Sequence, residues 1–283
     1  TGASIDLDNI ARDDAETFKA IRTTNTLGIF QIESPGQREL TGKHQPTEFN
    51  DLTIQISLFR PGPMKGNMIA PYLDGRHGFA KPDYMHPDLE PILRETFGVV
   101  IFHEHVIRIL HKMTGCGLAK ADEMRRSLEK PRVKPQIEKF FRTESAARGY
   151  SSEVIERVWS VIEGFSSFGF CKAHGAAFAL PTYQSAWLKT HYPTEFMAGL
   201  FTHDPGMYPK RLLMSEARRL GVRILPIDVN KSTNEYLVEK APRKTVEHAV
   251  IKTDEPEIGV RMVLNDIQGI SEPEVSRIIA AQP

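Results

Sequence analysis

Apolar residues recur every three or four positions along most of the chain, the spacing that places them on one face of an α-helix. The segments predicted to be helical cover residues 11–25, 46–63, 118–130, 134–149, 151–164, 193–204 and 208–221, with a short helix at 34–42 that is predicted from its capping Ser34 and terminal Gly42. Acidic first turns, glycines at the ends and prolines near the starts agree with these boundaries. The pattern therefore predicts a mainly α-helical protein.

A further helix is predicted after residue 172, where four apolar side chains are spaced i, i+4, i+7 and i+11. These are Ala176, Leu180, Tyr183 and Trp187. Such spacing forms one stripe, which we expect to be buried in the core. Pro181 lies inside the stripe and is expected to kink the helix.

Short apolar runs predict strands at 28–32, at the start of 98–115 and in a small β region after Gly221. The runs of that region are VRILPIDV, EYLVE, EHAVIK and GVRMVL. Residues 64–98 are rich in Gly, Pro and His, which predicts a long loop or small subdomain with little regular structure. Residues 267–283 predict a glycine turn and a short helix, half of a helix-hairpin-helix.

Composition is that of an ordinary globular chain: 283 residues, 40% hydrophobic and 25% charged. Two cysteines without a CxxC pair favour a reducing, cytoplasmic setting. The sequence has no apolar run long enough for a membrane helix, and its first residues are neither basic nor apolar, so we do not expect them to be a signal peptide. It does not begin with Met, so we expect a piece of a longer protein.

The 36 basic and 36 acidic residues give a formal net charge of zero, so any polyanion-binding surface must be local. Between Lys120 and Arg142 the basic residues outnumber the acidic ones by four. Guanidinium groups such as those of Arg125 and Arg126 can bind a phosphate in bidentate fashion. The alternative is a solvated helix face whose charges are neutralised by neighbouring acids.

Lys172 and His174 stand two residues apart at a predicted helix start, where free backbone N–H groups also favour anions. Together they could hold a triphosphate. The alternative is a surface lysine beside a hydrogen-bonded histidine.

Three other groups resemble known sites but lack the required spacing. His103, Glu104 and His105 do not follow the HExxH pattern of a helical zinc site. Asp6 and Asp8 have no third acid at a recognisable spacing, which favours an acidic linker. Cys171 has nothing to orient a base beside it, so a cysteine nucleophile is not expected.

Five segments occur in the order seen in the bacterial C-family DNA polymerases, the family of the DNA polymerase III alpha subunit, and resemble them closely. They are GIFQIESPGQREL (28–40), SLFRPGP (57–63), GVVIFHEHVIRI (98–109), ADEMRRSLEKP (121–131) and GFCKAHGAAFALPTYQSAWLKTHYPTEFMA (169–198). The resemblance extends from about residue 12 to the end of the chain.

The resemblance implies a multi-helix polymerase fingers region with small β elements, followed by the start of a helix-hairpin-helix module. It implies four parts: 1–64 as the palm-to-fingers connection and first fingers helices, 65–221 as the helical fingers domain, 222–265 as a small β region, and 266–283 as the start of that module.

In this family the fingers present basic side chains to the triphosphate of the incoming nucleotide. The positions that match are Arg125, Arg126, Phe168, Lys172 and His174, which the resemblance implies to be nucleotide-binding. The basic residues after the arginine pair, Lys130, Arg132 and Lys134, are expected to bind DNA.

No catalytic or metal-binding residue is expected here, because the family's metal-binding aspartates lie in the palm, which precedes these segments. We therefore expect Mg²⁺ only in the full-length enzyme and no polymerisation by this chain alone. The expected partners are primer–template DNA and deoxynucleoside triphosphates, with a sliding clamp or other replisome or mutasome proteins bound through regions outside the chain.

Residues 204–230 look closer to the error-prone, damage-tolerant branch of the family, which implies translesion synthesis and DNA repair. The alternatives are a part of the replicative alpha subunit, a non-catalytic DNA-binding module using the same basic helices, and a helical scaffold without a ligand. Triphosphate binding that depends on the two basic groups would discriminate among these classes.

Overall fold

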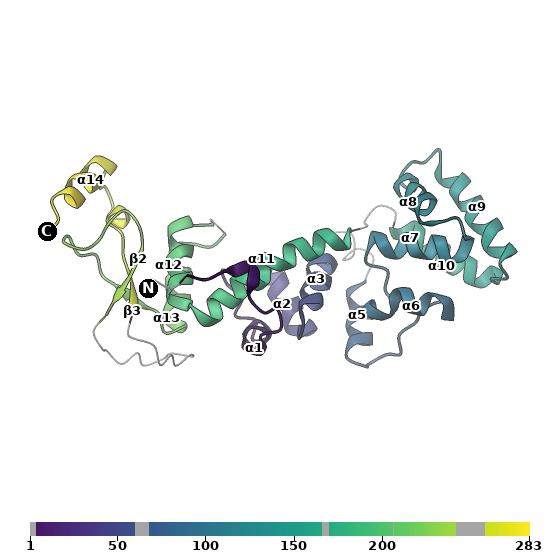
Figure 1. The fold of residues 1–283 in the computed structure, drawn as a ribbon, viewed down its shortest axis with the longest axis horizontal. Coiled ribbons are helices and arrows are strands. Elements are labelled where there is room, and N and C mark those ends of the chain that lie inside the picture. The colour runs from purple at the N-terminus through teal and green to yellow at the C-terminus, as the bar shows by residue number, and fades with distance from the viewer. Residues whose placement is uncertain (1–3, 60–67, 166–169, 206, 242–257) are drawn as a thin grey trace. The chain divides into compact units, whose positions relative to one another are not determined.

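The computed structural model describes residues 4–59, 68–165, 170–205, 207–241 and 258–283. Within these ranges most residues lie in α-helices, and three short strands form one sheet (Figure 1). The mainly α prediction is confirmed. None of the helices in these ranges has both the length and the apolar content needed to cross a membrane.

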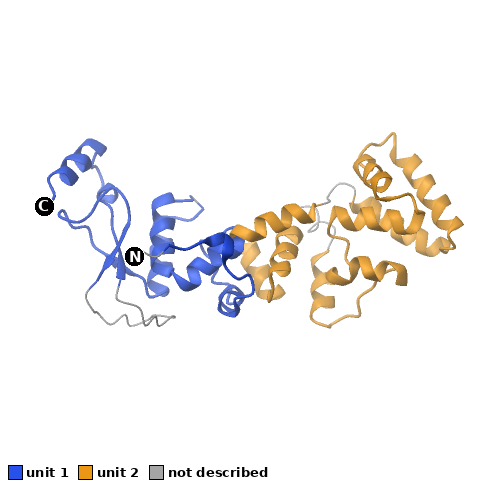
Figure 2. Cartoon of the chain, in the orientation of Figure 1, with its two compact units in different colours: residues 1–34, 182–283 blue, residues 35–181 orange. Residues whose placement is uncertain are grey.

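The chain divides into two compact units (Figure 2). Unit 1 contains residues 1–34 and 182–283, and unit 2 contains residues 35–181. Helix α11 (Lys172–His191) contributes to both, and the boundary follows Pro181 directly. The four-part division at residues 64, 221 and 265 remains a prediction.

The first part of unit 2 consists of α2 (Pro35–His44), α3 (Phe49–Leu58) and α5 (Ile69–Arg76), which share a buried polar network. His44 has Nδ1 3.1 Å from Gln55 Oε1 and Nε2 2.9 Å from the Tyr72 hydroxyl. Arg76 donates to both carboxylate oxygens of Asp51, at 2.6 and 2.7 Å. Each buried polar group in this network therefore has a partner, as burial requires.

The second part of unit 2 contains α6 (Glu90–Leu93), α7 (His103–Thr114), α8 (Leu118–Ser127), α9 (Lys134–Ala147) and α10 (Ser152–Phe165). The apolar faces of α7 to α10 enclose one core, in which the rings of Phe141 and Trp159 lie 5.5 Å apart. The helices predicted over 118–130, 134–149 and 151–164 are all present.

Unit 1 combines α1 (Ala15–Arg22), the second half of α11, α12 (Pro193–His203) and α13 (Lys210–Arg219) with the sheet and with α14 (Glu272–Ala280). The strand order is β1 (Arg223–Leu225), β3 (Ile258–Arg261), β2 (Leu237–Lys240). Strand β3 pairs parallel with β1 and antiparallel with β2. The predicted small β region is present, and its run EHAVIK (247–252) lies outside the described residues.

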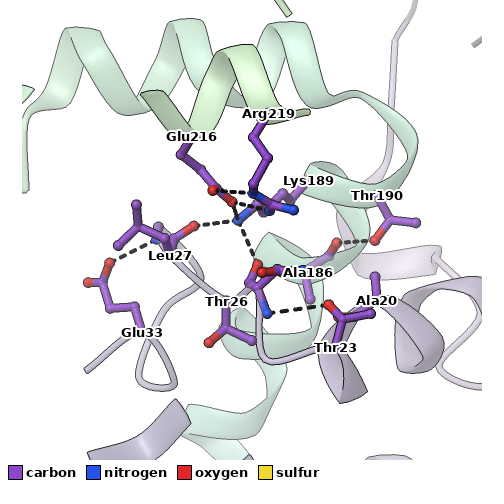
Figure 3. A network of polar contacts seen from close by, with 12 residues as sticks. Ala20, Thr23, Thr26, Leu27, Glu33, Ala186, Lys189, Thr190, Glu216 and Arg219 are labelled. Atoms are coloured by element: carbon purple, nitrogen blue, oxygen red, sulfur yellow. Dashed lines mark hydrogen bonds and ion pairs between the residues drawn. The ribbon is translucent and has the colours of Figure 1, made fainter. Parts of the chain in front are cut away.

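Lys189 connects α11 with α13 and with the turn at residues 25–27 (Figure 3). Its side chain is 5% exposed and donates to the carbonyls of Asn25 and Leu27 and to Glu216 of α13, at 2.7–2.8 Å. Glu216 also accepts two hydrogen bonds from Arg219. Burial raises the pKa of Glu216, but the Arg219 hydrogen bond and the Lys189 charge outweigh this and hold the pKa below its usual value.

Three predictions of local structure are wrong. The strand predicted at the start of 98–115 is absent, because in residues 98–102 only Phe102 pairs, in an isolated bridge with Phe170. Residues 28–32 form turns, because Gly28 and Gln31 have φ of +79° and +63°, which no strand accommodates. Residues 69–76 and 90–93 are helical, although the Gly, Pro and His content of 64–98 suggested little regular structure.

The buried stripe of α11 is also shifted from the predicted one. Tyr183 is buried, whereas Ala176, Leu180 and Trp187 are only half-buried. The buried positions include Gly175, Ala179 and Ala186. A Cβ at Gly175 would lie 2.7 Å from Ser57 Oγ, so small residues face the contact and the larger apolar ones lie beside it.

Candidate functional site

The start of α11 is held against the segment that leads into α7. Phe170 pairs with Phe102 in an isolated parallel bridge, and its carbonyl accepts the His103 N–H at 2.8 Å. The Lys172 N–H then donates to the carboxylate of Glu104, at 3.0 and 3.2 Å. A carboxylate from α7 therefore occupies the first N–H group of α11, the position predicted to favour anions.

The side chain of Lys172 is also paired. Its Nζ lies 2.5 Å from Glu95 Oε2 and 5.5 Å from the centre of the Phe102 ring. Both partners of the ion pair have side chains that are 35% exposed. The ammonium group therefore reaches solvent while it holds a carboxylate.

His105 holds Glu95 from the opposite side. It is buried, its Nδ1 accepts the Ile101 N–H at 3.2 Å, and its Nε2 lies 3.5 Å from Glu95 Oε1. Because Nδ1 is an acceptor, the proton of the neutral ring is on Nε2 and points to Glu95. The His105 hydrogen bond, followed by that from Lys172, lowers the pKa of Glu95 to about 2, and burial lowers the pKa of His105.

His174 lies two residues after Lys172 on α11 and is exposed. Its ring lies between those of Phe170 and Phe178, with centroids 5.0 and 4.4 Å away. The imidazole is therefore positioned by aromatic contacts. Phe168, the fifth predicted nucleotide-binding residue, lies outside the described residues.

The arginine pair lies in the last turn of α8. Arg125 and Arg126 both bond to Asp122, at 2.9 and 2.6 Å, and hydrogen bonds from Arg126 and then Arg125 lower the pKa of that carboxyl. The Arg126 side chain is 70% exposed and that of Arg125 only 19%. Arg126 is thus the member of the pair that a ligand can reach.

The three predicted DNA-binding residues follow directly. Lys130 and Arg132 are exposed, and across the described residues no ion pair engages either side chain. Lys134, at the start of α9, lies 2.5 Å from Glu163 Oε1. Among the described residues of this segment, the exposed basic side chains without an ion pair are therefore those of Lys130 and Arg132.

Within the ranges that the structure describes, no hydrogen bond or ion pair connects the α8 arginines with Lys172 or His174; the arginines pair with Asp122, and Lys172 pairs with Glu95. The sequence did not predict Glu95 and Glu104 as partners of Lys172, or His105 as the partner of Glu95. The available signal is the His-Glu-His run at the start of a helix, which contains two of these three residues.

Comparison with known proteins agrees with the predicted family. Residues 1–148 match the family described as the bacterial DNA polymerase III alpha subunit finger domain. This chain belongs to that family. The match includes α8 with the arginine pair, Glu95 and His105, so these residues are part of the finger domain.

Curated relatives align over more of the chain than the finger-domain match. The error-prone DNA polymerase of Symbiobacterium thermophilum is 39% identical over 98% of this chain, and that of Bdellovibrio bacteriovorus is 38% identical over 98%. The DNA polymerase III subunit alpha of Pasteurella multocida is 34% identical over 83%. These alignments cover 26%, 25% and 21% of the relatives, so the chain spans about a quarter of their length.

Proposed function

We propose that this chain is the part of a DNA-directed DNA polymerase that positions the incoming deoxynucleoside triphosphate and contacts primer–template DNA. The observation that carries the proposal is that a finger-domain member presents accessible basic side chains at two helix ends, Arg126 on α8 and Lys172 on α11. The relatives are named as DNA polymerases.

The chemistry of each side chain fits a different part of this task. The Arg126 guanidinium can donate two parallel hydrogen bonds to one phosphate. The Lys172 ammonium supplies a compact charge whose three protons can be shared between acceptors. Charge placed beside the phosphates stabilises the negative charge that develops in phosphoryl transfer, and it fixes the reacting group in position.

We assign no catalytic metal ion to this chain. Two-metal phosphoryl transfer requires carboxylates that hold both ions. The described ranges contain no group of three or more His, Cys, Asp or Glu side chains that could hold a metal. We assign Mg²⁺, together with any clamp or replisome partner, to other regions of a full-length, cytoplasmic polymerase.

We further propose the error-prone branch, with damage-induced translesion synthesis as its task. The support is alignment coverage: three relatives named error-prone DNA polymerase align over 98–100% of this chain, whereas two named DNA polymerase III subunit alpha align over 82–83%. A role as part of a replicative subunit is the alternative.

The first test is a titration of the 283-residue chain with dATP and Mg²⁺, followed by NMR. We expect saturable shifts at the Lys172 amide, and about tenfold weaker binding or more in Arg126→Ala/Lys172→Ala, because each charge-assisted bond contributes about 1.5–3 kcal/mol. Lys139→Ala removes an exposed charge of α9 and serves as the matched control.

Three further results would test the proposed function. Equal loss of binding in the Lys139→Ala control would show that the chain attracts nucleotides only by general charge. Absence of dATP binding together with intact binding of a DNA duplex would favour the non-catalytic DNA-binding module. In the full-length polymerase, Arg126→Ala should raise the nucleotide KM or lower kcat at unchanged DNA affinity.

A further inference from the structure

In the candidate site, the ammonium group of Lys172 is already paired with a carboxylate of the protein. The Glu95 carboxylate lies 2.5 Å from Nζ, and the two residues are 77 positions apart in the sequence. The contact is therefore made by the fold of unit 2 and cannot be an accident of neighbouring positions on one helix.

Glu95 is fixed in this contact. The neutral His105 ring, anchored by the Ile101 N–H, directs its Nε2–H at Oε1, while Oε2 faces the lysine. A neutral donor orients the carboxylate without cancelling its charge. The pKa of about 2 keeps Glu95 ionised throughout the physiological range.

A second carboxylate lies at the same place. Glu104 accepts the Lys172 N–H with both oxygens, so the backbone donor beside the ammonium is also occupied. Glu95 thus neutralises the ammonium and Glu104 occupies the backbone N–H, so an approaching phosphate meets a lysine whose donors are already in use. The ion pair is 35% exposed on each side, which makes it weak enough to exchange.

We propose that Glu95 is an intramolecular competitor of the triphosphate: its carboxylate occupies Lys172 in the unliganded protein and is displaced from the ammonium when a nucleotide binds. This rests on the proposed function, because it requires that Lys172 binds phosphate. Glu95 would thereby set the affinity for the nucleotide below what the lysine alone would give. A triphosphate that contacts Lys172 but no other residue of the site would therefore bind with low affinity.

The test compares Glu95→Gln with the unchanged chain. Glutamine keeps the acceptor for the His105 Nε2–H and removes the charge. Glu90→Gln is the control, since it removes the same charge five residues earlier from a pair with Arg94. The probes are dATP with Mg²⁺ and inorganic tripolyphosphate, titrated by NMR, with circular dichroism to verify the fold.

We expect Glu95→Gln to bind both probes about two- to fivefold tighter, the range set by a half-exposed ion pair of up to about 1 kcal/mol, with Glu90→Gln unchanged. The double variant Glu95→Gln/Lys172→Ala should bind no tighter than Lys172→Ala, because Glu95 acts through the lysine.

Unchanged or weaker binding by Glu95→Gln would overturn the inference, since Glu95 would then position Lys172 without competing. A gain that persists in the double variant would also overturn it, because the carboxylate would be repelling the ligand directly. If Lys172→Ala binds as well as the unchanged chain, the proposed role of Lys172 itself fails. Weaker binding by Lys172→Ala with no gain in Glu95→Gln rejects the inference alone.

Discussion

At the scale of single residues, His44 shows how burial controls a charge. It is fully buried, and its two ring nitrogens contact Gln55 and Tyr72. Burial, and then the nearby Arg76 charge, lowers the pKa of His44 to about 4. The ring is therefore neutral in the folded protein at pH 7.

Acid should destabilise unit 2 through this residue. Below about pH 6.5 the unfolded chain takes up a proton that folded His44 refuses, so the free energy of unfolding falls as the pH drops toward 4. At 1.36 kcal/mol per pKa unit the loss reaches about 3 kcal/mol. Urea unfolding of a Trp187→Phe variant, followed by the remaining Trp159 in unit 2, measures it.

His44→Gln should reduce this pH dependence, whereas His111→Gln, a change at an exposed histidine of α7 in the same unit, should leave it unaltered. An equally steep dependence in His44→Gln would assign the acid sensitivity to other groups of unit 2, namely the buried His105 or carboxylates.

The sequence predicted the candidate site only in part. Lys172 and His174 could be predicted because a basic pair before an apolar helix is a local pattern. Arg125 and Arg126 lie in a segment with a local excess of basic residues, and the family resemblance supported both pairs. Glu95 could not be found in this way. Its contact with Lys172 depends on the Phe102–Phe170 bridge, which joins segments far apart in the sequence.

At the scale of elements, Lys189 holds α11, α13 and the turn at residues 25–27 together in unit 1 (Figure 3). Its three donors are all used and almost no water reaches them. Lys189→Met should lower the free energy of unfolding by about 3 kcal/mol, because two carbonyls lose their donor and the buried Glu216 carboxylate keeps only its hydrogen bonds from Arg219.

Trp187 fluorescence during urea unfolding of Trp159→Phe chains reports this change in unit 1. Lys19→Met, also in unit 1, breaks an exposed pair with Glu16 and should cost at most about 1 kcal/mol. Adding Glu216→Gln to Lys189→Met should restore part of the loss, since the buried side chain at position 216 then carries no charge. A loss no greater than that of Lys19→Met would mean that water replaces the ammonium.

Elements with a long, regular apolar pattern could be predicted, and short or irregular ones could not. Helices α9 and α10 bury one continuous face, so their sequences alone predict them. The strand predicted at 28–32 is wrong because Ile29 and Ile32 are buried by consecutive turns, whereas Phe30 is exposed. The buried residues of α11 were predicted incorrectly because close packing at Gly175 places small residues at the contact.

At the scale of the whole molecule, the equal numbers of acidic and basic residues mean that no overall charge draws the chain to DNA. Binding must then depend on local groups that are not already paired. Of the three predicted DNA-binding residues, Lys130 and Arg132 meet this condition, whereas Lys134 is engaged by Glu163.

This difference predicts an order of effects on the salt dependence of DNA binding. Each phosphate contact contributes about 0.9 to the slope of log K against log salt concentration on duplex DNA, through released counterions. Lys130→Gln and Arg132→Gln should each reduce the slope by about that amount. Lys134→Gln should reduce it less, because its ammonium must first leave Glu163.

Fluorescence anisotropy of a labelled primer–template duplex, between about 50 and 200 mM salt, measures these slopes. Lys19→Gln on α1, which breaks only an exposed pair with Glu16, is the control. Equal slopes in all four variants would place the phosphate contacts elsewhere, with the glycine turn and α14 as the next segment to alter. A larger effect at Lys134 would mean that DNA binding itself opens the Lys134–Glu163 pair.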